Sequence, residues 1–221
     1  MANKKLHVAL GLFSLEDTLS MLRRVGDYVD IIELGTPLMV AEGSRAVGAV
    51  KAAWPEKCVF ADIKVMDGGS EVPRSAVDAG CDMFSVLAAA ADPTLQAAID
   101  LAHEHGVKVL ADFCNVDDMS ARARQVAALG TDYLCCHVGY DLQAQGIDPV
   151  EELRALDVVD TPKAIAGGIK LETFEQAIES SAQIIISGGG IYNSPDPAAT
   201  ARAMREMVDA YNATHEEQPC R

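Results

Sequence analysis

The chain has 221 residues, a formal net charge of -15 and an apolar fraction of 49%. The length suits one large α/β domain or two small ones, and the apolar content excludes an intrinsically disordered protein. The negative charge disfavours a nucleic-acid partner and an anionic membrane surface, because both are bound through basic patches. An anionic small-molecule substrate is still compatible, since backbone dipoles and a metal ion can hold phosphate on an acidic protein.

The cysteines are predicted to be free thiols of a protein in a reducing compartment rather than members of disulfide bonds. None forms a C-x-x-C pair, and most lie in apolar runs, so buried free thiols in a reducing cytoplasm are expected. The first five residues lead into only about five apolar ones, too few for a signal peptide or a membrane span. We therefore predict a soluble, cytoplasmic protein. The six cysteines are Cys58, Cys81, Cys114, Cys135, Cys136 and Cys220.

Short apolar, β-branched runs recur about every 25 residues, which leaves room for one strand, one helix and two loops. Strands are predicted at 6–10, 29–34, 59–64, 83–87, 107–112, 133–137, 163–166 and 184–187. Helices are predicted between them at 15–25, 45–53, 75–79, 94–105, 121–128, 150–156, 173–180 and 197–211. Eight β-α pairs predict a single (βα)8 TIM barrel over residues 1–213, followed by a loose tail at 214–221.

A doubly wound open sheet is the competing fold. It usually has fewer strands and favours a G-x-G-x-x-G motif after the first one. The first predicted strand continues instead into Gly11-Leu12-Phe13-Ser14. No linker, low-complexity segment or break in composition divides the chain, so one barrel domain is the better interpretation.

Polar residues end several of the predicted strands. In a (βα)8 barrel the catalytic groups cluster at the C-terminal strand ends, so these residues should form one ring. Side chains alternate along a strand, so Asp62 and Lys64 should also point the same way. The predicted ring consists of Glu33, Asp62, Lys64, Asp112 and His137.

The residue types of this ring indicate metal-assisted and acid–base chemistry. Glu33 and Asp62 are hard oxygen ligands that suit Mg²⁺, together with water and substrate oxygens. Lys64 can balance those charges structurally or donate to an oxyanion as it develops. His137 ends an apolar strand, a position that favours general acid–base use.

Glycine-rich turns follow the last two predicted strands. They expose backbone N–H groups where phosphate commonly binds in such barrels. The candidate phosphate-binding residues are Gly167, Gly168, Gly188, Gly189 and Gly190. Asp67 lies beyond its strand, where it could cap a helix or reach out of its own barrel, and its position alone leaves both open.

Together these motifs resemble the orotidine-monophosphate decarboxylase superfamily. The resemblance is closest to its branch of 3-hexulose-6-phosphate synthases and 3-keto-L-gulonate-6-phosphate decarboxylases. The D-x-K-x-x-D signature stands as Asp62-Ile63-Lys64-Val65-Met66-Asp67. Similar to other motifs of that branch are 31–37 at the second strand, 137–146 at the sixth, and the phosphate loops 166–170 and 188–191.

The resemblance implies a role for each ring residue. Glu33 and Asp62 would bind Mg²⁺, and Lys64 would help to hold an enediolate. His137 would move protons, and Asp112 would support the substrate or the water shell of the metal.

For Asp67 the resemblance implies a place in the neighbouring subunit's active site. The enzyme would then be an obligate homodimer with shared active sites. Its substrate would be a sugar phosphate.

Two reactions of this branch pass through an enediolate. In the synthases, ribulose 5-phosphate loses its C1 proton and the enediolate adds to formaldehyde to give 3-hexulose 6-phosphate. In the decarboxylases, loss of CO₂ gives a similar enediolate, which is then protonated. The decarboxylases tend to carry arginines near Tyr140 and Gly189 and a glutamate at the position of Asp112, so this chain resembles the synthases more.

The chain departs from the family at the end of the first strand. The family usually has Ala-Leu-Asp there, whereas this chain has Ala9-Leu10-Gly11. An acid that contacts substrate hydroxyls or steadies Lys64 is therefore missing. A sugar-phosphate-binding homologue without catalysis is a third interpretation for this reason.

Overall fold

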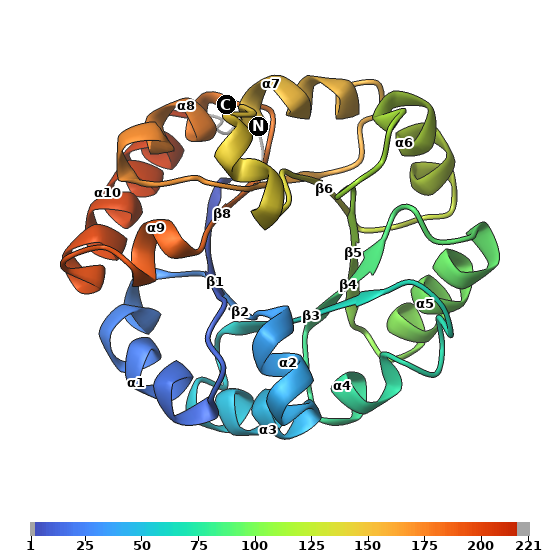
Figure 1. The fold of residues 1–221 in the computed structure, drawn as a ribbon, viewed down its shortest axis with the longest axis horizontal. Coiled ribbons are helices and arrows are strands. Elements are labelled where there is room, and N and C mark those ends of the chain that lie inside the picture. The colour runs from blue at the N-terminus through green and yellow to red at the C-terminus, as the bar shows by residue number, and fades with distance from the viewer. Residues whose placement is uncertain (1–2, 216–221) are drawn as a thin grey trace, which may run out of the picture.

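The computed structural model describes residues 3–215 and contains a closed barrel of eight parallel strands in sequence order (Figure 1). Each strand pairs with the next one along the chain, and β8 pairs with β1. The predicted (βα)8 barrel is therefore confirmed. The strands are β1 (Lys5–Leu10), β2 (Ile31–Leu34), β3 (Cys58–Val65), β4 (Met83–Leu87), β5 (Lys108–Asp112), β6 (Tyr133–His137), β7 (Lys163–Ala166) and β8 (Ile184–Ser187).

Helices surround the strands as an outer ring (Figure 1). They are α1 (Leu15–Val25), α3 (Ser44–Ala53), α4 (Arg74–Asp78), α5 (Asp92–Glu104), α6 (Met119–Ala128), α7 (Pro149–Leu153), α8 (Phe174–Glu179) and α10 (Pro197–His215). The 3-10 turns η1 (Gly26–Tyr28), η3 (Arg154–Leu156) and η4 (Leu171–Thr173) lie beside them. Within residues 3–215, none of the helices has the length and apolar character needed to cross a membrane.

Among the short elements that were not predicted, three directly follow the C-terminal end of a strand. They are α2 (Thr36–Glu42) after β2, η2 (Tyr140–Gln145) after β6 and α9 (Gly189–Tyr192) after β8. Figure 1 shows α2 inside the helix ring, beside β2 and β3. These elements shape the mouth of the barrel at the end where the polar ring was predicted.

The last helix continues beyond its predicted end. The sequence predicted that this helix ends at residue 211 and that a loose tail begins at residue 214. In the structure, α10 continues to His215. The Thr214 hydroxyl donates to the carbonyls of Ala210 and Tyr211, which holds it on the helix. Residues 214 and 215 therefore belong to α10, and the remainder of the predicted tail, 216–221, lies outside the described residues.

Side-chain alternation along the strands creates two apolar cores. Residues that point outwards pack under the helices, and residues that point inwards fill the barrel. The inner core consists of Ile31, Phe60, Met83, Leu110, Cys135, Ala164, Ala166, Ile184 and Ile186. For five of these residues, the residue two positions later in the chain is polar. It lies on the same face of the strand and closer to the C-terminal mouth of the barrel. These polar residues are Glu33, Asp62, Ser85, Asp112 and His137.

The described cysteines are free thiols, as predicted. Cys81, Cys135 and Cys136 are buried, and the other two are half-buried. Burial raises the pKa of Cys81 and of Cys136 to about 12, so both thiols stay protonated and inert. Cys220 lies outside the described residues.

Candidate active site

A lysine between two buried carboxylates forms the centre of the site. Lys64 Nζ lies 2.9 Å from both oxygens of Asp62 and 3.0 Å from Asp112 Oδ2. Only 6% of Asp62 and 3% of Asp112 are exposed. Burial alone would lower the pKa of Lys64, but the charges of Asp62 and Asp112 outweigh it and raise that pKa above its usual value. The ammonium is therefore charged throughout the physiological pH range.

The backbone of β3 is irregular where it presents this lysine. Lys64 has a φ of +43°, in the left-handed region that non-glycine residues rarely adopt. The β3–β4 register shifts between Ala61 and Val65. Asp62 and Lys64 were predicted to point the same way; their side chains are in contact, but through a distorted strand end rather than through regular alternation. Such local strain is concentrated at functional sites, where the surrounding structure enforces it.

Two hydroxyls orient the Asp62 carboxylate, and the sequence reasoning missed both. Ser85 Oγ donates to Asp62 Oδ1 at 2.7 Å and accepts from the backbone N–H of Lys64 at 2.9 Å. Thr36 Oγ1 donates to Asp62 Oδ2 at 2.6 Å. Ser85 could have been found as the inward polar residue of β4, a strand that had no member in the predicted ring. Thr36 gave no comparable signal, because its contact depends on the unpredicted helix α2.

A histidine–aspartate pair adjoins the lysine. His137 Nδ1 lies 2.9 Å from Asp112 Oδ2, and the backbone N–H of Cys114 donates to Asp112 Oδ1 at 2.9 Å. Burial lowers the pKa of His137, but its hydrogen bond to Asp112 and the charge of that carboxylate outweigh burial and raise it. Burial likewise opposes ionisation of Asp112, yet His137 and Lys64 hold the pKa of Asp112 down to about 2. With Nδ1 directed at Asp112, Nε2 is the nitrogen left for proton transfer.

Glu33 lies against a buried histidine that the sequence reasoning did not single out. Glu33 Oε2 is 2.8 Å from His7 Nε2, and His7 is completely buried in the barrel. No described residue offers either ring nitrogen of His7 an aligned hydrogen bond. The His7 ring also packs edge-on against Phe60, with centroids 5.3 Å apart. The contact with the buried His7 ring therefore fixes the position of the Glu33 carboxylate, whose side chain is 11% exposed.

The donor set determines what kind of metal the site could accept. Among residues 3–215, no group of three His, Cys, Asp or Glu side chains could hold a metal ion. Glu33 and Asp62 are both buried, on neighbouring strands, and supply only hard oxygen donors. Two carboxylates suit Mg²⁺, which keeps several waters and takes other oxygens from its substrate, and do not suit zinc.

The two glycine-rich turns meet at the mouth. A Cβ on Gly190 would collide with the carbonyl of Ile169 and lie 2.8 Å from Lys170 Cα. A Cβ on Gly167, whose φ is +111°, would lie 2.5 Å from the carbonyl of Val138. Ser187 Oγ donates to the Ile169 carbonyl at 2.8 Å and ties the loops after β7 and β8 together. The packing requires glycine at both positions.

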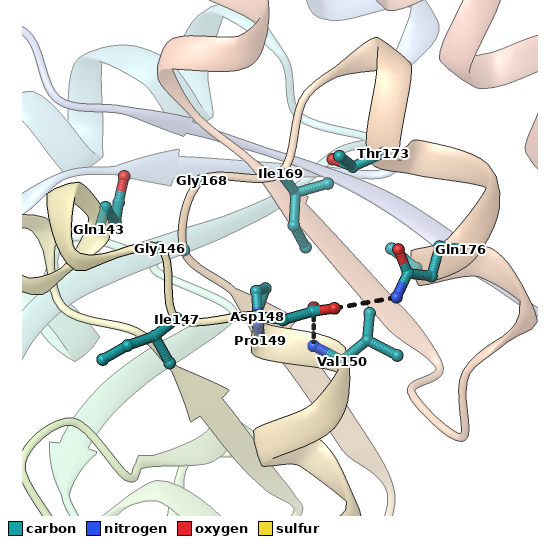
Figure 2. Close-up of a pocket in the computed structure, with 12 residues that line it drawn as sticks. Gln143, Gly146, Ile147, Asp148, Pro149, Val150, Gly168, Ile169, Thr173 and Gln176 are labelled. Carbon is teal, nitrogen blue, oxygen red and sulfur yellow. Dashed lines mark hydrogen bonds between the residues drawn. The ribbon is translucent and has the colours of Figure 1, made fainter.

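A cavity of about 250 Å³ lies beside the first of these turns (Figure 2). Gln176 Nε2 donates to Asp148 Oδ2 at 3.0 Å across it. It is lined by Gln143, Gly146, Ile147, Asp148, Pro149, Val150, Gly167, Gly168, Ile169, Thr173, Gln176 and Ala177. Of the predicted phosphate glycines, this set contains the pair after β7. Of the triplet after β8, Gly188 and Gly189 lie near Tyr192, whereas Gly190 packs against Ile169.

Asp67 stands apart from the ring. Its side chain is exposed, and Asp67 Oδ1 accepts a hydrogen bond from the backbone N–H of Gly68 at 2.8 Å. Met66 and Val72, on either side of it, are 54% and 50% exposed. Asp67 is therefore exposed in a segment with exposed apolar neighbours, and it makes no hydrogen bond or ion pair to any of the described ring residues.

Comparison with known proteins agrees with this geometry. The chain matches the Orotidine 5'-phosphate decarboxylase / HUMPS family over residues 4–204. It is 40% identical to the 3-hexulose-6-phosphate synthase of Bacillus subtilis, over 92% of this chain and 98% of that relative. The crystal structure of 3-hexulose-6-phosphate synthase from Salmonella typhimurium has a TM-score of 0.91 and 36% identity, over 94% of this chain and 99% of that one.

A decarboxylase is also among the similar structures. The 3-keto-L-gulonate-6-phosphate decarboxylase of Vibrio cholerae has a TM-score of 0.83 and 28% identity, over 95% of this chain and 99% of that one. Its identity is lower than that of the synthases, as the motifs predicted. The family match and the identities extend over nearly the whole chain, which therefore belongs to the Orotidine 5'-phosphate decarboxylase / HUMPS family.

Proposed function

We propose that this protein catalyses the Mg²⁺-dependent aldol condensation of ribulose 5-phosphate with formaldehyde to 3-hexulose 6-phosphate, and its reverse. The observation that carries the proposal is the Lys64 ammonium, held 2.9 Å from Asp62 and 3.0 Å from Asp112 at the barrel mouth. A fixed cation next to an acid–base histidine suits the formation and stabilisation of an enediolate. The 40% identity to a synthase supports this reaction over decarboxylation.

In the proposed reaction, His137 transfers the proton. Its Nε2 removes a proton from C1 of ribulose 5-phosphate, and Asp112 stabilises the resulting imidazolium. Lys64 donates to the enediolate oxygen, where negative charge develops. C1 then forms a bond to the carbon of formaldehyde, and the imidazolium returns the proton to the former aldehyde oxygen. The proton taken from C1 is returned to the product, so the reaction needs no further acid or base.

Glu33 and Asp62 would hold Mg²⁺ in this scheme. When bound, the ion would supply a divalent charge beside the substrate oxygens as they become negative. Thr36 and Ser85 keep the Asp62 carboxylate oriented for that task through hydrogen bonds of 2.6 and 2.7 Å. The contact between His7 and Glu33 would hold the Glu33 carboxylate in position in the same way.

The backbone N–H groups of the two glycine-rich turns would bind the phosphate. The tight packing of Gly190 against Ile169 and the Ser187 hydrogen bond bring the loops after β7 and β8 together at one side of the mouth. This is the place where barrels of this kind commonly bind phosphate. The candidate contacts are Gly167, Gly168, Gly188, Gly189 and Gly190.

The proposed function predicts two separate signals from the purified protein. With ribulose 5-phosphate and Mg²⁺ it should consume formaldehyde, and in deuterated water it should exchange the C1 proton even without formaldehyde. Exchange without consumption would show an enediolate with another electrophile and would contradict the synthase assignment. Release of CO₂ from 3-keto-L-gulonate 6-phosphate would favour the decarboxylase instead. A folded protein with neither exchange nor CO₂ release would be a binding homologue.

We further infer a homodimer in which Asp67 enters the site of the partner subunit. Its exposed carboxylate and the exposed apolar side chains of Met66 and Val72 support this, as does the family resemblance. Several large exposed apolar side chains in one short segment are typical of an interface.

The shared site predicts complementation between two inactive variants. Lys64→Ala and Asp67→Ala should each be inactive alone. After unfolding and refolding as an equal mixture, they should recover about one quarter of wild-type activity, because half of the dimers carry one intact site of two. Refolded single variants are the control. If the mixture stays as inactive as its components, Asp67 acts within its own chain or not at all.

A cytoplasmic location is also proposed. It is supported by the five described cysteines, all of which are free thiols. Thiols persist in this form in reducing compartments.

A further inference from the structure

The space beside Gly11, where the family usually has an acid, is occupied by a tyrosine. A Cβ on Gly11 would lie 3.1 Å from Tyr192 Oη and 3.8 Å from its Cζ, and no other described residue comes within 4 Å. Gly11 is not in the left-handed region, so its backbone would accept a side chain. The tyrosine alone fills this space.

The same tyrosine borders the glycine triplet after β8. Tyr192 Cε1 lies 3.7 Å from the position of a Cβ on Gly188, and Tyr192 Oη lies 3.9 Å from that of a Cβ on Gly189. The hydroxyl is thus placed between the end of β1 and the proposed phosphate loop. It is half-buried and makes no hydrogen bond to any residue within 3–215. A polar group held in this way is available to a ligand.

The protonation state of Tyr192 makes its hydroxyl a hydrogen-bond donor. Burial, assisted by the nearby Tyr140, raises the pKa of Tyr192 above its usual value of about 10. The phenol therefore keeps its proton at neutral pH. A carboxylate in this place would repel a phosphate dianion, whereas a phenol donates to it.

We propose that the Tyr192 hydroxyl donates a hydrogen bond to the phosphate group of the substrate, and that Gly11 leaves the room this requires. The inference rests on the proposed phosphate site at the glycine turns. In this proposal Tyr192 is a substrate-binding residue. Gly11, which stands where the family usually has an acid, belongs to the same site. A side chain at position 11 would push the phenol away from the loop.

Binding of inorganic phosphate and of the unreactive analogue ribitol 5-phosphate tests the contact. Calorimetry with the Mg²⁺-loaded protein should show both dissociation constants raised about 10-fold in Tyr192→Phe, the usual effect of losing one hydrogen bond to a charged group. Gly11→Ala should weaken both ligands in the wild-type background but add little in the Tyr192→Phe background, since no hydroxyl is left to displace. Thermal unfolding checks that each variant is folded.

Tyr28→Phe is the matched control. Tyr28 lies before β2, at the opposite end of the barrel, where its hydroxyl accepts from Arg202 at 3.0 Å. Its removal should leave both dissociation constants unchanged. Unchanged phosphate binding in Tyr192→Phe would overturn the proposal, and so would weakening of ribitol 5-phosphate alone, which would place the contact at a sugar hydroxyl. Weakening of both ligands would support it even if the wild type consumed no formaldehyde, because binding and turnover are measured separately.

Discussion

Replacing Lys64 by methionine should lower kcat by about 10³-fold, the loss typical for one preorganised donor to a developing oxyanion. The side chain keeps its length and loses only the ammonium. The C1 proton exchange should fall by a similar factor, because the enediolate itself loses its fixed cation. KM should change much less, since this contact strengthens as charge develops in the transition state.

The same substitution should also destabilise the fold. It leaves the carboxylates of Asp62 and Asp112 buried without their shared cation. Breaking a buried ion pair by removing one partner costs about 3 kcal/mol or more. Urea unfolding at pH 7 measures this loss.

Lys51→Met is the matched control for this variant. Lys51 Nζ lies 2.7 Å from Asp82, and its side chain is 28% exposed, against 29% for Lys64. The pair joins α3 to the start of β4, away from the mouth. Its variant should keep wild-type kcat. If Lys64→Met retained more than a tenth of wild-type kcat while remaining folded, the lysine would be a structural counter-ion only.

Asp112→Asn should lower kcat by about 10³-fold and move the pH dependence of the reaction. The amide cannot hold His137 with Nδ1–H towards it as firmly, nor stabilise an imidazolium. The charge of Asp112 raises the pKa of His137, against burial and the nearby Lys64 and with help from Asp62. Removing that charge lowers the pKa of His137. Because the unprotonated ring takes the C1 proton, the ascending limb of kcat against pH should move to lower pH.

The stability of the pair should depend on pH in two windows. The raised pKa of His137 means that its contribution is complete below the unfolded value of about 6.5 and is lost as pH rises through the folded value. The lowered pKa of Asp112 means that its contribution is complete above about 4 and is lost as pH falls towards 2. Denaturant unfolding from pH 3 to pH 9 should show both effects in the wild type and neither in Asp112→Asn. If the ascending limb of kcat against pH stayed at its wild-type position in Asp112→Asn, a group other than His137 would be responsible for it.

Several features of the site could be predicted from the sequence because they depend on periodicity. An apolar strand that ends in a polar residue places that residue at the barrel mouth, whichever strands lie next to it. Glu33, Asp62, Asp112 and His137 were found in this way, each two positions beyond a residue of the inner core. Ser85 also lies two positions beyond an inner-core residue, but it stands inside the strand 83–87 and does not end it, so the strand-end pattern did not indicate it.

The distorted end of β3 could not be predicted. Alternation along a regular strand was the basis for predicting that Asp62 and Lys64 point the same way. Lys64 has a positive φ, and in this conformation its backbone N–H donates to the Ser85 hydroxyl, which also holds Asp62. Such strain is maintained by neighbours from another strand, and no local propensity encodes it.

By itself, the sequence determined the eight-strand barrel, the ring of polar residues at its mouth and the free thiols, because these follow from the order and spacing of side chains. Only the tertiary structure decided which of those groups touch. Lys64 meets Asp112 across 48 positions of the chain, and Thr36 meets Asp62 across 26. It also placed Tyr192 beside Gly11, where the sequence showed only a missing acid. Closure of the barrel brings these distant residues together. The register and the local distortions of the strands set the distances between them, and both depend on packing between strands rather than on local sequence.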